Sequence, residues 1–370
     1  MVALLFACAP GCAFAGRPPL LQPERADTVL ERLPRGYASL EPLATAKPTS
    51  APTLAQIRAL LAMAARTGDS RLAARAEALL AKRPDASSPD VMKARAFAAQ
   101  HRHDFAGALQ LLDATLARDP QDADARLSRA QIRLVQGRLD LARLDCATLT
   151  LGLQVDAGAL CLIALSMRRG DQAEAARLAD MAIAQAGEDR ELTRYLLATR
   201  AEIASRAGSP DADTWFRRAL ALVPDDVRTL AAYARFLRLH RRDAEALALL
   251  AHAPDTDGLQ LQRTLAAHAV GAPDSARLVA SQGRRYALAY AVGAQPEMRD
   301  EAEYLLTLRG EAPAALQLAL LNFRQQRDVE DVDILQRAAL AAGQPQALAG
   351  LRAWMHSQQL ALPKPTVPRR

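Results

Sequence analysis

Apolar residues recur along most of the chain at steps of three and four positions, which is the period of an α-helix. In the stretch 105–116 they fall at Phe105, Ala108, Leu109, Leu112 and Leu116. The same spacing returns in the stretches 139–149, 230–237 and 246–253. Val, Ile, Tyr and Thr, which favour strands, are sparse, whereas Ala, Leu and Arg favour helix. We therefore predict an all-α fold.

Two interleaved series of helix-breaking positions divide this pattern. The members of the first series recur every 33 to 38 residues and are Gly68-Asp69, His103-Asp104, Gly137-Arg138, Gly170-Asp171, Gly208-Ser209 and Arg242-Asp243. The second series lies about halfway between them, at Pro84-Asp85, Asp119-Pro120, Gln154-Val155, Gly187-Glu188 and Pro224-Asp225. Two such series predict a tandem array of helix–turn–helix units, each about 34 residues long.

A single hairpin of this kind cannot bury its own apolar face, so neighbouring units must stack. The pattern is regular over residues 53–254, which we interpret as about six repeats. From 255 to 360 it continues in weaker form, with breaks at Gly271, Gly310 and Gly343. We interpret this region as divergent helical repeats that end in a C-terminal cap; a separate helical domain is the alternative.

The two ends of the chain lack the repeat pattern. Residues 1–15 combine a short apolar run with the small-x-small motif Ala13-Phe14-Ala15, which is typical of a signal peptide and predicts export to the periplasm or out of the cell. A lipoprotein acylated at Cys8 or Cys12 is the alternative. The run is too short to span a membrane. Residues 16–52 are rich in proline and predicted to be extended, and residues 361–370 are predicted to be a disordered tail.

Cleavage after residue 15 would leave two cysteines, Cys146 and Cys161, on consecutive predicted helices. An even number of cysteines in an oxidising compartment is compatible with a disulfide. Free cysteine also packs as a small apolar residue, so two buried thiols are the interpretation we prefer and the disulfide is the alternative. The sequence leaves both possibilities open.

Several small residues occupy equivalent places in successive units. They are an alanine in the first helix (Ala96, Ala130, Ala234), a turn glycine (Gly68, Gly137, Gly170), an alanine early in the second helix (Ala108, Ala142, Ala175, Ala246), a late small residue (Ala182, Ala219, Ala253) and a closing proline (Pro84, Pro120, Pro224). In these positions the chain resembles the tetratricopeptide repeat (TPR) family. The resemblance implies a right-handed superhelical α-solenoid, in which the first helices line a concave groove that takes an extended peptide or a partner's helix.

The resemblance also implies which side chains face this groove. They are Arg58, Arg66, Lys93, His101, Gln131, Arg168, Arg206, Arg235 and Arg238. This set is mostly basic, which favours an acidic peptide or a C-terminal carboxylate held by forked arginine hydrogen bonds. An ordinary solvated helix face in an arginine-rich protein explains the same residues more simply, and the basic groove is the hypothesis to be tested against it.

The sequence contains no recognisable catalytic, metal or cofactor motif. His101 and His103 are two positions apart, so on a helix they point in different directions and do not form a metal pair. Arg169-Gly170-Asp171 spells an adhesion tripeptide but coincides with a repeat turn. The 47 basic and 41 acidic residues are interspersed, and no basic run alternates with aromatic residues, which argues against nucleic-acid binding.

These observations predict a non-catalytic protein–protein interaction scaffold of the bacterial envelope, with no cofactor. One alternative is a cytosolic TPR regulator or adaptor whose start codon is mis-assigned. The other is an enzyme with a site in the divergent C-terminal helices, a region that is rich in Ala and Leu and has only isolated charges.

Overall fold

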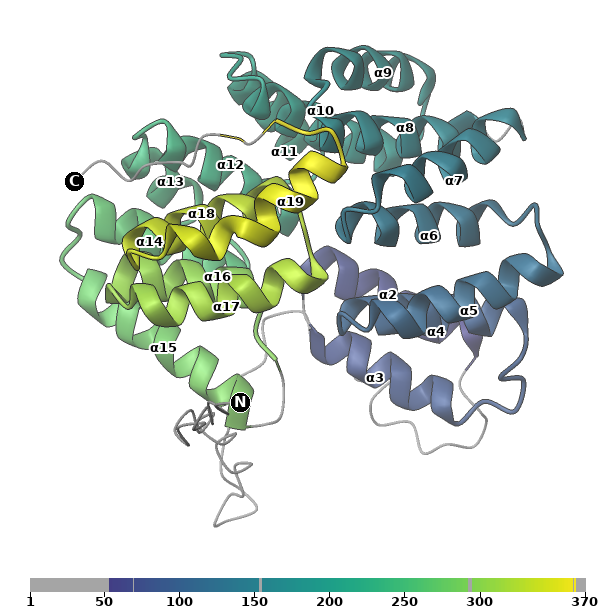
Figure 1. Cartoon of the computed structure of the whole chain (residues 1–370), viewed down its shortest axis with the longest axis horizontal. Helices are drawn as coiled ribbons and strands as arrows, with labels where there is room; N and C mark the ends of the chain where they lie inside the picture. Colours follow the sequence, from purple (N-terminus) through teal and green to yellow (C-terminus); the bar gives the residue numbers. More distant parts are fainter. Residues whose placement is uncertain (1–52, 69, 153–154, 292–294, 362, 364–370) are drawn as a thin grey trace, which may run out of the picture.

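The structure is a computed structural model that describes residues 53–68, 70–152, 155–291, 295–361 and 363. The predicted signal peptide, the proline-rich segment up to residue 52 and nearly all of the predicted tail lie outside these residues. Every regular element in the described part of the chain is a helix. The predicted all-α solenoid is confirmed (Figure 1).

Consecutive helices form antiparallel pairs, and each pair stacks on the next. The pairs of the first part of the chain are α2 (Leu54–Thr67) with α3 (Ser70–Ala81), α4 (Pro89–His101) with α5 (Phe105–Arg118), α6 (Ala123–Val135) with α7 (Leu139–Leu151), α8 (Val155–Arg169) with α9 (Gln172–Gln185), α10 (Arg190–Arg206) with α11 (Ala212–Leu222), and α12 (Val227–Leu239) with α13 (Asp243–Leu249). The pairing continues with α14 (Asp257–Ala269) and α15 (Ser275–Ala291), α16 (Met298–Glu303) extended by the π-helical η2 (Tyr304–Arg309) and paired with α17 (Ala312–Gln325), and α18 (Val329–Ala341) followed by the short 3₁₀ helix η3 (Pro345–Leu348) and α19 (Ala349–Ser357). The helical hairpins therefore run on beyond residue 254.

The helix boundaries follow from residues that recur once per unit. Several helices begin after an aspartate whose side chain accepts a hydrogen bond from the third backbone N–H of the helix, as Asp104 does from Gly107 and Asp122 from Ala125. Such caps satisfy N–H groups that have no partner inside the helix. The turn at Gly137 has a backbone φ of +69°, which glycine adopts without strain.

Alanine lets the helices approach closely where the pairs stack. Ala108, Ala130, Ala142 and Ala234, which occupy recurrent positions in the sequence, are fully buried. Larger side chains fill the space around them, as in the cluster of Phe216, Tyr233 and Leu237 between α11 and α12. These apolar clusters mainly join helices that are neighbours in sequence, which is the expected way for hairpins in a row to be stabilised.

Cys146 of α7 and Cys161 of α8 form a disulfide, with their Cα atoms 5.3 Å apart. Both residues are buried in the cluster that joins α6, α7 and α8. Of the two possibilities left by the sequence, the structure therefore contains the bridge and not a pair of free thiols.

A buried carboxylate is a second cross-link in this region. Asp145 on α7 is 1% exposed, and its oxygens lie 2.6 Å from Arg129 Nη2, 2.7 Å from Arg133 Nη1 and 3.5 Å from Arg126 Nη1 on α6. Three guanidinium groups thus converge on one carboxylate. A buried charge that is paired in this way is costly to leave without its partners.

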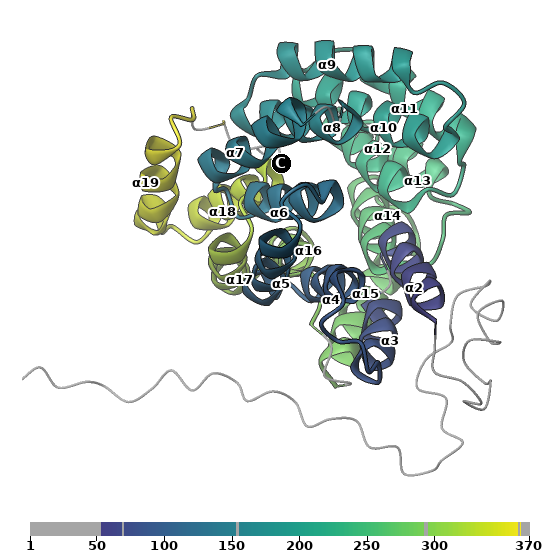
Figure 2. The same cartoon turned by 90° about the vertical axis from the view of Figure 1, so that its right-hand side faces the viewer.

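The row of hairpins curves back on itself, so that its C-terminal helices lie beside α5, α6 and α7 (Figure 2). The even-numbered helices face the centre and the odd-numbered helices lie outside. Hydrogen bonds join the C-terminal part to the turn between α6 and α7: Arg327 N donates to Val135 O at 2.8 Å, and Trp354 Nε1 donates to Gly137 O at 3.1 Å. The Trp354 ring lies so close to Gly137 that a Cβ added there would be 2.7 Å from it. The solenoid is therefore closed on itself.

No helix in the described ranges has both the length and the apolar character needed to cross a lipid bilayer.

Candidate binding cavity

The inner helices surround a central cavity of about 1280 Å³. Its wall is built almost entirely by the even-numbered helices from α2 to α18, because these form the concave side of the solenoid. Leu134, Ile163 and Leu265 contribute apolar surface, and arginines and carboxylates contribute charge. The cavity thus combines apolar wall with charged groups, as ligand-binding sites do.

The structure places six of the nine predicted groove residues in the wall of this cavity. These six are His101, Gln131, Arg168, Arg206, Arg235 and Arg238. Arg58, Arg66 and Lys93 do not line it. Arg58 forms an exposed ion pair with Asp90, and Lys93 Nζ lies 2.8 Å from Asp122 at the start of the next inner helix. Their role in binding a partner remains a prediction.

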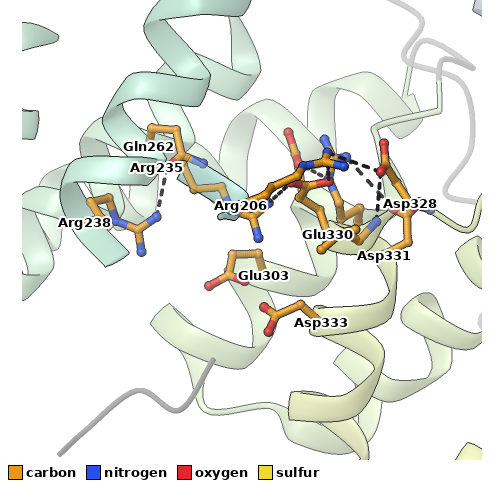
Figure 3. A network of polar contacts seen from close by, with 12 residues as sticks. Arg206, Arg235, Arg238, Gln262, Glu303, Asp328, Glu330, Asp331 and Asp333 are labelled. Carbon is orange, nitrogen blue, oxygen red and sulfur yellow. Dashed lines mark hydrogen bonds and ion pairs between the residues drawn. The ribbon is translucent and has the colours of Figure 1, made fainter. Parts of the chain in front are cut away.

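Four of these residues form one basic surface, which we call the arginine wall: Arg168 on α8, Arg206 on α10, and Arg235 and Arg238 on α12. The spacing of the inner helices brings them together although they span about 70 residues of sequence. They face α16 and α18, which carry the carboxylates Glu303, Asp328, Glu330 and Asp333 (Figure 3).

Ion pairs connect the arginine wall to the start of α18. Arg168 Nη2 lies 2.9 Å from Asp328 Oδ2, and Arg206 Nη2 lies 3.5 Å from Asp328 Oδ1 and 3.4 Å from Glu330 Oε2. Arg235 Nη1 lies 3.4 Å from the other oxygen of Glu330. The acidic side of the cavity is therefore supplied by the chain itself.

The pKa shifts show how strongly these charges interact. Burial alone would raise the pKa of Asp328, but the charges of Arg168 and Arg206 hold it well below its ordinary value. In the same way burial opposes ionisation of Glu303, yet the charge of Arg337 lowers the pKa of Glu303 to about 2. Both carboxylates are therefore ionised at neutral pH.

Arg235 and Arg238 are less well compensated. Burial and then the charge of Arg299 lower the pKa of Arg235 to about 10, although 29% of its side chain is exposed where it borders the cavity. Burial also lowers the pKa of Arg238. Both guanidinium groups stay charged at neutral pH, because arginine loses its proton only in strongly basic solution. This part of the wall therefore favours an added negative charge.

Three buried N–H groups of the wall make no hydrogen bond within the described part of the chain. They are Arg168 Nη1, Arg206 Nη1 and Arg238 Nε. A buried donor without a partner costs free energy comparable to a lost hydrogen bond. Because these atoms are shielded from the cavity in this arrangement, a carboxylate reaches them only after the neighbouring side chains move.

His103, in the turn between α4 and α5, contacts the C-terminal part of the solenoid. Its Nε2 is 3.0 Å from Glu297 Oε1, and Gln326 Nε2 donates to its Nδ1 at 3.2 Å. Burial opposes protonation of His103, but the hydrogen bond to Glu297 raises its pKa overall. Burial and the charge of His103 lower the pKa of His101. The sequence does not show which part of the chain packs over the turn at His103.

The sequence did not single out the carboxylates of α16 and α18 as part of the cavity. The available signal was the spacing of Glu330, Asp333 and Arg337, which places three charges on one face of a helix. That face opposes the arginine wall only because the row of hairpins closes. Among the described residues no group of three or more His, Cys, Asp or Glu side chains is arranged to hold a metal ion.

Comparisons with known proteins add little to this description. No protein-family model matches the chain, and no curated protein matches it. Among solved structures the chain is similar to the TPR domain of P58(IPK), with 16% identity and a TM-score of 0.24; the match covers 79% of this chain and 99% of that chain. The fold assignment therefore rests on the helix pairs and their stacking.

Proposed function

We propose that the chain is a non-catalytic interaction scaffold of the bacterial envelope, and that its arginine wall binds an acidic peptide or helix of a partner protein. A solenoid of helix pairs presents an extended concave surface, which is typical of proteins that bind other proteins. The observation that carries the proposal is the convergence of Arg168, Arg206, Arg235 and Arg238 on one cavity, in which burial lowers the pKa of Arg235 and of Arg238.

Two features support a location outside the cytoplasm. The start of the sequence resembles a signal peptide. The disulfide between Cys146 and Cys161 fits an oxidising compartment, since such bridges are rare in cytosolic proteins. Fractionation of cells that express the tagged protein would test this, and recovery of the uncleaved protein in the cytosol would contradict it.

The binding proposal is tested with a fluorescein-labelled peptide of alternating Glu and Ser, measured by fluorescence anisotropy. A peptide of alternating Lys and Ser is the charge control. We expect the double variant Arg235→Glu/Arg238→Glu to bind the acidic peptide at least about tenfold more weakly, because each hydrogen bond to a charged group contributes about 1.5–3 kcal/mol.

The matched control is the double variant Arg177→Glu/Arg277→Glu. These arginines lie on the outer helices α9 and α15, and each is exposed and paired with an acid three residues away. The control changes net charge by the same amount. Equal loss of binding in both variants would show that the attraction is a general effect of charge and would refute the groove. Capture from envelope extracts followed by mass spectrometry would then identify the natural partner.

A further inference from the structure

The arginine wall is already in contact with an acidic helix, and that helix belongs to the same chain. Asp328 caps the N-terminus of α18, and Glu330 lies in its first turn. Together they contact Arg168, Arg206 and Arg235. An acidic helix from a partner would need the same guanidinium groups.

The contact between this helix and the wall differs from the packing elsewhere in the solenoid. Hairpins that follow one another in sequence are joined by apolar clusters of fully buried residues. The C-terminal residues 295–361, which we call the closing segment, reach the first half of the chain mainly through ion pairs and single hydrogen bonds. Within the described residues, the apolar cluster formed by α6, α7 and α8 includes one side chain of the closing segment, Leu360. Polar side chains therefore make most of these contacts, together with the Trp354 ring at Gly137.

The closing segment also leaves part of the wall unused. Arg168 and Arg206 each use Nη2 toward the acids of α18, while their Nη1 groups make no hydrogen bond in the described part of the chain. Asp328 and Glu330 supply two carboxylates to three arginines. A peptide with several carboxylates could satisfy more of these donors than α18 does.

From these observations we infer that the closing segment is an internal, displaceable occupant of the groove, so that the solenoid is autoinhibited. In the closed form the first turn of α18 covers the arginine wall. In the open form the closing segment separates from α6, α8, α10 and α12, and the wall accepts an acidic ligand. A ligand that binds only the open form shifts the population toward it. The inference rests on the proposed function for the identity of the ligand, but the closure itself can be measured without a ligand.

The test uses the full chain with the double substitution Asp328→Asn/Glu330→Gln. Asparagine is as good a helix cap as aspartate, so α18 should stay folded. The matched control is Asp140→Asn/Glu188→Gln, which also removes two carboxylates, at exposed positions on the outer helix α7 and in the turn after α9. Circular dichroism verifies that both variants keep their helix content.

Without any peptide, we expect the Asp328/Glu330 variant to show a larger radius of gyration in small-angle X-ray scattering. Amide hydrogen exchange should also be faster at the start of α18. The control should match the wild type in both measurements. The variant should bind the Glu-Ser peptide roughly tenfold more tightly than the wild type, because an internal occupant lowers the apparent affinity by the fraction of molecules that are open.

The outcomes separate the two proposals. A larger radius and faster exchange without peptide binding would support the closure and refute the acidic ligand. Peptide binding that depends on Arg235 and Arg238, with radius, exchange and affinity all unchanged in the Asp328/Glu330 variant, would support the ligand and overturn the autoinhibition.

Discussion

The disulfide between α7 and α8 makes a prediction whose size follows from its position in the sequence. Cys146 and Cys161 are 15 residues apart, so the bridge closes a short loop around the turn between the two helices. Reduction would remove this constraint from the unfolded chain. In the chain-entropy description, a loop of this length contributes about 3 kcal/mol to stability.

This loss should be local at first. In a row of hairpins each unit contributes its own stability and that of its interfaces, so the unfolding of α7 and α8 does not require all other helices to unfold. We expect reduction to create or shift an early step in urea unfolding. The m-value scales with the surface exposed, and at about 1–3 kcal/mol per M a loss of about 3 kcal/mol lowers the midpoint of that step by about 1–3 M.

The assay compares urea unfolding of the oxidised protein and of the protein kept in a thiol reductant, followed by circular dichroism. Hydrogen exchange then shows whether α7 and α8 lose protection first. Peptide mapping without reduction should recover the segments around Cys146 and Cys161 as one linked species; two separate thiol peptides would refute the pairing. If alkylation proves that the bridge is reduced and the unfolding curve stays the same, the entropic reasoning is wrong.

Three further predictions concern single residues. The pKa of His103 is raised in the folded state. Its contact with Glu297 therefore stabilises the folded protein fully below the pKa of histidine in the unfolded chain, about 6.5, and this stabilisation is lost as the pH rises through the raised pKa of the folded state. His103→Ala should remove this slope, at most about 1 kcal/mol, from thermal unfolding measured across that range. Gly137→Ala should destabilise the folded protein more than Gly170→Ala does. Both glycines have positive φ, but only a Cβ at Gly137 meets a side chain, the Trp354 ring, so Gly137→Ala should also shift tryptophan fluorescence. Asp145→Asn should cost about 3–5 kcal/mol in urea unfolding, since it leaves buried guanidinium groups without their partner; a loss below about 1 kcal/mol would contradict that account.

The local part of the fold was predictable because each signal lies within one unit of the sequence. The apolar period, the aspartate caps and the turn glycines all act over a few residues. Gly137 and Gly170 have positive φ, as turn positions require, and the alanines at equivalent places are buried. Such signals fix where helices begin and end and which face is apolar.

The closure was not predictable in the same way. The closure depends on the small rotation between each hairpin and the next, summed over the whole array. No single repeat determines this total rotation. For this reason the contacts of Glu297 with His103 and of Asp328 with Arg168 could not be predicted from the sequence. The same sum decides which inner residues reach the cavity. Arg235 does reach it, while Arg58 lies outside it and pairs with Asp90.

The distribution of contacts also explains why the solenoid can open without unfolding. When the closing segment separates from α6, α8, α10 and α12, the ion pairs of Asp328 and Glu330, a few hydrogen bonds and the contact of Leu360 are broken. The apolar clusters between neighbouring hairpins stay in place. These ion pairs keep side-chain exposures between 15% and 29%, so each is stronger than a surface pair, but they are few and are partly screened by salt. The free energy of opening is therefore set by a small number of charges, which is the condition under which one acidic ligand can shift the balance.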